Sequence, residues 1–211
     1  MKIRINKRKW SRTLNKTPIR VTEVLDFFAP PWLVDWKLRV GKAEANRISK
    51  AAMKIGSRVD ELIKRSPMTG LVMEKSVADK EEVKNCMVAY KKWLEVYKPK
   101  AITPCTRLYA TIEGIEVTGE PDLDIDECIT DLKCASKISI SHKIQDNVYE
   151  FIRRQLKLKP YPEVAILRLD KITGSFEYFR EPYNQNLVDC WRGLLKAYVY
   201  YNGGVHDGVE V

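Results

Sequence analysis

The amino-acid sequence predicts a mixed α/β domain whose N-terminal half is helical. Apolar residues recur every three or four positions over 43–65 and again over 80–97, which is the spacing of helices with one buried face. After Pro99 the pattern changes to short, strand-like runs separated by turn residues. A further helical stretch over 141–157 precedes a strand pair and a last helix. This order favours a central mixed sheet flanked by helices.

The predicted elements follow one another with short connections. The first helix opens at Thr22, its expected N-cap, and ends at Pro30-Pro31, because proline cannot continue a helix. A second helix begins near Trp32, and Gly41 separates it from the long helix over 43–65, whose apolar stripe includes Ile48 and Ala52. We expect strands over 108–112, 115–119, 128–133, 164–169 and 176–179, and helices over 141–157 and 184–201.

Positive charge is concentrated at the N-terminus. The whole chain carries a formal net charge of +9, and residues 1–22 hold eight lysines and arginines and no acid. We therefore expect a basic arm over 1–20, followed by a single domain over 21–211. Such an arm suits a polyanion, because binding releases counterions from phosphates. The residues expected to contact nucleic acid are Lys7, Arg8, Lys9 and Arg12. A solubilising, disordered tail is the alternative reading.

Composition excludes several other classes of protein. No apolar run approaches 18 residues, so no membrane partner is expected, and the basic N-terminus lacks the apolar stretch of a signal peptide. The five cysteines are scattered and none forms a C-x-x-C pair. Free thiols are therefore expected, with neither a zinc site nor an iron–sulfur cluster. We expect a cytoplasmic protein, from a prokaryote or from a phage-infected host cell.

One acidic segment carries the chemistry. Asp131 and Lys133 are two positions apart on a predicted strand, so their side chains leave the same face of the sheet. Asp122 enters the same region from the preceding turn. Carboxylate oxygens are the ligands that Mg²⁺ and Mn²⁺ prefer, and Lys133 could activate water or offset developing negative charge. A surface hairpin with solvated charges is the alternative.

Two motifs in this part of the chain resemble a known family. Gly119–Asp122 followed by Ile129–Lys133 resembles the G-x-x-D … D-x-K core of PD-(D/E)XK nucleases. The stretch Gln145–Tyr149 is similar to the Q-x-x-x-Y helix of the RecB-like branch, which includes phage exonucleases and the mitochondrial genome-maintenance exonuclease. The resemblance implies a restriction-endonuclease-like core. It also implies that Asp122 and Asp131 bind the metal, and that Gln145 and Tyr149 act beside Lys133 in catalysis.

The resemblance extends upstream with one departure. Gly56–Asp60 is similar to the family pattern G-[ST]-x-V-H, whose histidine binds metal. Asp60 stands at the histidine position here, and it can also bind Mg²⁺, so the resemblance implies a third metal ligand. Arg58 in the same stretch is expected to contact nucleic acid.

Together these observations predict a DNA nuclease that depends on Mg²⁺ or Mn²⁺. We expect an exonuclease of DNA replication, recombination or repair, acting on DNA that is single-stranded or has free ends. A structure-specific endonuclease that uses the same site stays open. So does a catalytically silent nucleic-acid-binding protein with the same fold, which the departure at Asp60 favours and the set Asp122, Asp131 and Lys133 opposes.

Overall fold

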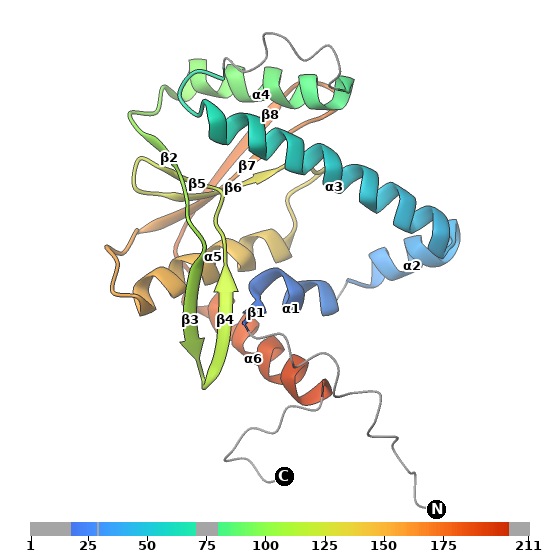
Figure 1. The fold of residues 1–211 in the computed structure, drawn as a ribbon, viewed down its shortest axis with the longest axis vertical. Helices are drawn as coiled ribbons and strands as arrows, with labels where there is room; N and C mark the ends of the chain where they lie inside the picture. The colour runs from blue at the N-terminus through green and yellow to red at the C-terminus, as the bar shows by residue number, and fades with distance from the viewer. Residues whose placement is uncertain (1–17, 29, 71–79, 203–211) are drawn as a thin grey trace, which may run out of the picture.

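The protein folds as two mixed β-sheets flanked by helices, which confirms the predicted α/β class (Figure 1). The computed structural model describes residues 18–28, 30–70 and 80–202. The helices are α1 (Val21–Phe27), α2 (Pro31–Val40), α3 (Lys42–Arg65), α4 (Glu81–Tyr97), α5 (Ile140–Gln155) and α6 (Gln185–Tyr201). The strands are β1 (Ile19–Arg20), β2 (Ile102–Pro104), β3 (Leu108–Ile112), β4 (Ile115–Gly119), β5 (Leu123–Ile125), β6 (Ile129–Lys133), β7 (Glu163–Leu169) and β8 (Phe176–Pro182).

The larger sheet has the strand order β2-β5-β6-β7-β8. Only β6 and β7 in it run parallel, and α5 forms the crossover between them. The smaller sheet has the order β1-β4-β3, with β1 parallel to β4. The sequence predicts one central sheet, whereas the chain passes from one sheet to the other between β4 and β5. Pro121 lies in that connection and has no N–H to donate to a sheet ladder, which accounts for the break.

Two apolar cores hold these layers together. In Figure 1, α3 and α4 lie on one side of the larger sheet and α5 on the other. The first core joins α3 and α4 to the larger sheet and includes the buried rings of Tyr90 and Trp93. The second joins α1, α5 and α6 to β4 and β6 and includes the fully buried Trp191. The indole N–H of Trp191 donates a hydrogen bond to the Val21 carbonyl (3.3 Å), which ties the last helix to the first.

The start of the fold differs from the prediction in two ways. Thr22 is not an N-cap, because α1 begins at Val21 and the residue in the capping position is Arg20, which makes no side-chain capping bond. The reason is that β1 pairs with β4 and leads directly into the helix. Ile19 and Arg20 therefore belong to the folded domain, whereas the expected arm reaches position 20. Residues 1–17 lie outside the described part of the chain.

The apolar stripe of α3 is buried over only part of its length. Ile48 is 38% exposed and Ala52 is also exposed, whereas Ile55, Val59 and the residues after them reach the first core. None of the described residues of α2 is buried. Figure 1 shows that α2 and the first half of α3 extend beyond the sheets, so that no sheet lies beneath this part of the stripe.

The structure also shows the state of the cysteines. All five cysteines are free thiols. Over residues 18–28, 30–70 and 80–202, no helix has the length and apolar character needed to cross a bilayer.

Gly119 provides a test of how closely β4 packs on α5. A Cβ atom at this position would lie 2.5 Å from Cε1 and 2.6 Å from Cδ1 of Tyr149, so Gly119→Ala must displace that ring. We expect the free energy of unfolding to fall by about 1–3 kcal/mol, as overpacking usually causes. Gly193→Ala in α6 is the matched control. No atom lies within 4 Å of the added methyl there, and the substitution should stabilise the helix by about 0.5–1 kcal/mol. Urea unfolding of both variants measures this; equal stabilities would contradict the prediction.

Candidate active site

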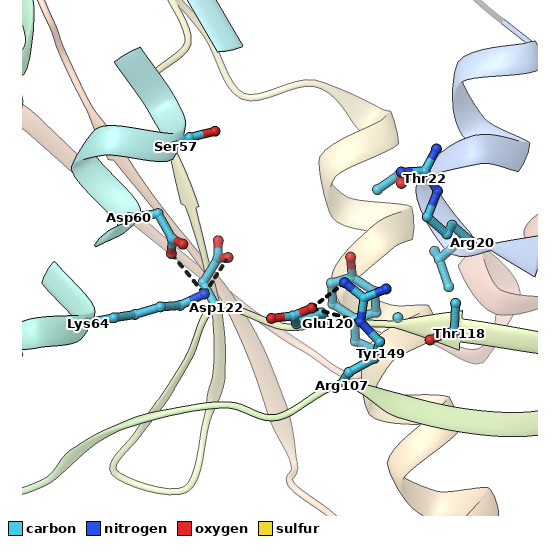
Figure 2. A pocket seen from close by; sticks show the side chains of 12 residues that line it. Arg20, Thr22, Ser57, Asp60, Lys64, Arg107, Thr118, Glu120, Asp122 and Tyr149 are labelled. Atoms are coloured by element: carbon cyan, nitrogen blue, oxygen red, sulfur yellow. Dashed lines mark hydrogen bonds and ion pairs between the residues drawn. The ribbon is translucent and has the colours of Figure 1, made fainter. Parts of the chain in front are cut away.

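An open cleft of ≈ 490 Å³ lies between α3, the end of β4 and α5. Figure 2 shows Asp60, Lys64 and Asp122 gathered on one side of it, with Glu120, Arg107 and Tyr149 facing them. Its charged lining residues are Arg20, Asp60, Lys64, Arg107, Glu120 and Asp122. Acids and bases in roughly equal number make this a polar cleft, unlike the mainly apolar pockets that bind small organic ligands.

Asp122 connects three parts of the chain. Its Oδ2 accepts a hydrogen bond from the Leu132 N–H of β6 (2.7 Å), which fixes the turn after β4 against that strand. Its Oδ1 lies 3.7 Å from the Lys64 ammonium. Lys64 also pairs with Asp60 one turn earlier on α3 (3.0 Å), and the dashed lines of Figure 2 mark both contacts. The two predicted metal ligands Asp60 and Asp122 therefore share one lysine.

Asp131, Lys133, Gln145 and Tyr149 form a connected group of polar side chains behind the cleft. Asp131 is 2% exposed, and its Oδ2 makes a close ion pair with Lys133 Nζ. Gln145 Nε2 donates to Asp131 Oδ1 (2.7 Å) and lies 3.1 Å from the Tyr149 hydroxyl. Lys133 Nζ donates to Gln145 Oε1 (3.3 Å). The spacing of two on β6 and of four on α5 thus brings together four of the five residues that the two motifs indicate, Asp122 being the fifth.

Burial and neighbouring charges shift the pKa values of Asp122 and Lys133. Burial and the neighbouring Asp131 raise the pKa of Asp122 to about 8, against the opposing effects of Lys133 and the Leu132 N–H. Burial alone would lower the pKa of Lys133, but Asp131, Asp146 and Asp122 outweigh it, and the net shift is upward. Lys133 therefore stays an ammonium ion at neutral pH, and Asp122 binds protons well above the usual range for a carboxyl group.

The donor set suits a hard divalent cation. Asp60, Asp122 and Asp131 offer carboxylate oxygens, which Mg²⁺ and Mn²⁺ prefer. Within the described residues, no three histidine, cysteine, aspartate or glutamate side chains already converge as a ready metal site. Lys64 instead pairs with Asp60 and Asp122, and Lys133 pairs with Asp131. The two ammonium groups therefore already offset the negative charge of these carboxylates. A bound metal would supply the same neutralisation of the crowded carboxylates.

Several residues of this region escape prediction from the sequence. Lys64 has a partial signal, because it follows Asp60 by four positions on a helix, a spacing typical of ion pairs. Arg107 pairs with Glu120 (2.6 Å) across the small sheet, which no local pattern indicates.

The residues expected to contact nucleic acid are Arg58 and four residues of the basic arm. Arg58 pairs with Glu61 (3.0 Å) and does not line the cleft. The arm residues Lys7, Arg8, Lys9 and Arg12 lie outside the described residues.

Comparison with known proteins gives similarity in fold alone. No protein-family model matches the sequence, and no curated protein matches it. A crystal structure from Eubacterium rectale, described as a "putative exonuclease", aligns with a TM-score of 0.57 and 15% identity, covering 98% of this chain and 89% of that one. The crystal structure of a protein called SSO0001 aligns with a TM-score of 0.45 and 12% identity, covering 92% and 84%. The first alignment shows that this chain shares the overall fold of that protein.

The raised pKa of Asp122 predicts that the metal-free protein loses stability as pH rises. The folded chain holds this proton up to a pH of about 8, whereas an unfolded aspartate releases it near 4. Between these values the folded state binds more protons, so the free energy of unfolding falls as pH increases. We expect the melting temperature in EDTA to fall between about pH 5 and pH 8, and Asp122→Asn to reduce that slope.

Asp170→Asn is the control for this measurement. Hydrogen bonds from the backbone N–H groups of Thr173 and Ile172 lower the pKa of Asp170 to about 2. Asp170 therefore does not titrate in the window of the experiment, and its substitution should leave the slope unchanged. Parallel curves for wild type and Asp122→Asn would refute the assignment.

Proposed function

We propose that this protein is a metal-dependent DNA nuclease of the PD-(D/E)XK superfamily, RecB-like branch, and that it acts as an exonuclease. The observation that carries the proposal is the contact network of the two motifs. Asp131 and Lys133 of β6 meet Gln145 of α5, and Asp122 is bonded to the backbone of the same strand. Neither motif alone is specific, because short acid–base patterns are common. Their convergence beside an open polar cleft supports one shared site.

The residues have separable roles in this proposal. Asp122 and Asp131 would hold Mg²⁺ or Mn²⁺, with Asp60 near them, and the bound cation would polarise the phosphate and lower the pKa of an attacking water. Lys133 would offset the negative charge that develops on the phosphate oxygens. Gln145 would hold the side chains of Asp131 and Lys133 in fixed positions, since it makes a hydrogen bond to each.

The walls of the cleft suit a phosphate backbone. The cationic residues that line the cleft are Arg20, Lys64 and Arg107, and Lys64 lies beside Asp122. Phosphate oxygens pair readily with such groups, whereas base recognition would require side chains directed into a groove. A nuclease that acts on ends needs backbone contacts more than sequence recognition. This supports DNA with single strands or free ends as the substrate.

Substitution of Asp131 tests the proposed chemistry. Asp131→Asn keeps the volume of the side chain and the hydrogen bond from Gln145, but it removes one anionic metal ligand. We expect cleavage in Mg²⁺ or Mn²⁺ to fall by at least about 10³-fold, with DNA binding and folding retained. The substrates are end-labelled linear DNA, circular single-stranded DNA and supercoiled plasmid, each also incubated with EDTA.

The pattern of products separates the alternatives. Shortening of linear DNA alone supports an exonuclease, whereas nicking of circular substrates supports an endonuclease. Binding of DNA without cleavage of any substrate supports a catalytically silent protein. Wild-type turnover by Asp131→Asn would refute the site itself.

Deletion of residues 1–17 tests the DNA partner separately from catalysis. This segment holds seven positive charges and no acid, and it precedes β1, so the folded strand and α1 stay intact. If about four of these charges meet phosphates, the deletion should flatten the log–log salt dependence of binding by roughly 3 to 4. Turnover at saturating DNA should change little. Fluorescence anisotropy at several salt concentrations measures the slope; an unchanged slope would exclude the arm from DNA binding.

A further inference from the structure

Asp146 carries a fully buried carboxyl group that no hydrogen bond satisfies. The residue is 0% exposed, and neither oxygen has a hydrogen-bond partner. The polar residues beside it on α5 are all bonded: Gln145 to Asp131, Asn147 to the Asn184 N–H, and Glu150 to the Tyr161 N–H. Buried polar groups without partners are rare and cost stability, so one that persists calls for an explanation.

Asp146 follows Gln145 of the proposed active site on α5. Gln145, the residue before it, touches both Asp131 and Lys133. Burial raises the pKa of Asp146 well above its usual range, Asp131 raises it further, and Lys133 opposes both effects. Conversely, Asp146 raises the pKa of Lys133 more than Asp122 does. Asp146 is therefore within electrostatic reach of both members of the Asp131–Lys133 ion pair.

Metal binding would disturb that ion pair. In the structure each oxygen of Asp131 has one partner, because Oδ2 pairs with Lys133 and Oδ1 accepts from Gln145. A divalent cation on Asp131 would compete with Lys133 for the same carboxylate and would repel its ammonium group. Lys133 would then keep the amide oxygen of Gln145 but would lose its anionic partner. A buried ammonium left without a counter-charge is strongly unfavourable.

We propose that Asp146 is a positioning residue that becomes the anionic partner of Lys133 when Asp131 binds the metal. This inference rests on the proposed function, in which Asp131 is a metal ligand. The two free oxygens of Asp146 can accept hydrogen bonds from the ammonium without competing with any bond in the metal-free chain. Asp146 thereby lowers the free-energy cost of displacing Lys133, and it keeps the ammonium inside the site, where catalysis needs it.

Binding of Mn²⁺ in the absence of DNA tests this role. Isothermal titration calorimetry should show that Asp146→Asn, which keeps the shape but cannot carry charge, weakens Mn²⁺ binding by about 10- to 100-fold, as expected for loss of a charge-assisted contact. Asp146→Ala should weaken it to a similar extent, and it serves if the Asn variant does not fold. Asp170→Asn, the same substitution on a loop away from the cleft, should leave the affinity unchanged.

A double-mutant cycle separates positioning from a merely structural role. Lys133→Met removes the ammonium that Asp146 is proposed to receive, and Asp146 then stays neutral. In that background Asp146→Asn should change Mn²⁺ affinity by less than about twofold, so the two effects are strongly non-additive. A residue needed only for folding would lower the melting temperature in EDTA and leave Mn²⁺ affinity unchanged in both backgrounds. That result, or equal weakening with and without Lys133, would overturn the inference.

The same titrations distinguish this inference from the proposed function. If wild type binds Mn²⁺, Asp131→Asn does not, and Asp146→Asn binds like wild type, only the role of Asp146 is wrong. If wild type fails to bind Mn²⁺, or if Asp131→Asn binds it equally well, the metal site is wrong and both proposals fall.

Discussion

Repulsion among crowded carboxylates is the constraint around which the site is built. Asp60 and Asp122, from a helix and a turn, line one side of the cleft, and Asp131 lies behind it on the neighbouring strand β6. Burial and the neighbouring Asp131 make Asp122 costly to ionise, and its raised pKa reflects that cost. Lys64 and Lys133 supply the compensation. Because buried ion pairs contribute little net stability, the Asp131–Lys133 pair is not accounted for by its contribution to folding.

The strand β6 separates this polar group from the apolar core by alternation. Leu132 packs with the core formed by α3 and α4, whereas its neighbours Asp131 and Lys133 face α5. The helix α5 presents both apolar and polar side chains toward β6. Val148 and Ile152 belong to the second core, whereas Gln145 makes a hydrogen bond to Asp131. The apolar contacts of the two cores thus offset the cost of burying Asp146 on α5 without a hydrogen-bond partner.

The aspartate at position 60 and the lysine one turn later form a consistent pair. In the family pattern that the sequence resembles, a histidine stands where Asp60 stands here. A neutral imidazole would not pair with Lys64, whereas the carboxylate does so at 3.0 Å and shares the lysine with Asp122. Asp60 in place of histidine therefore adds one negative charge to α3 at the cleft, and Lys64 on the same helix offsets it. Under the proposed function, this combination would place a hard, anionic donor where the pattern has a metal ligand.

Most of the fold and half of the site could be predicted from the sequence, because both rest on short-range periodicity. Spacings of three and four defined the long helices, and the spacing of two placed Asp131 and Lys133 on one face. The strands β1, β2 and β5 have only two or three residues, too few to show a period, and they form because partners from distant parts of the chain are present. The roles of Lys64 and Arg107 and the isolation of Asp146 likewise depend on which surfaces the folded chain brings together. The sequence by itself determined which charges the protein carries and on which face of each element they lie. Only the tertiary structure decided which of those charges are compensated, because burial and pairing are properties of the packed chain.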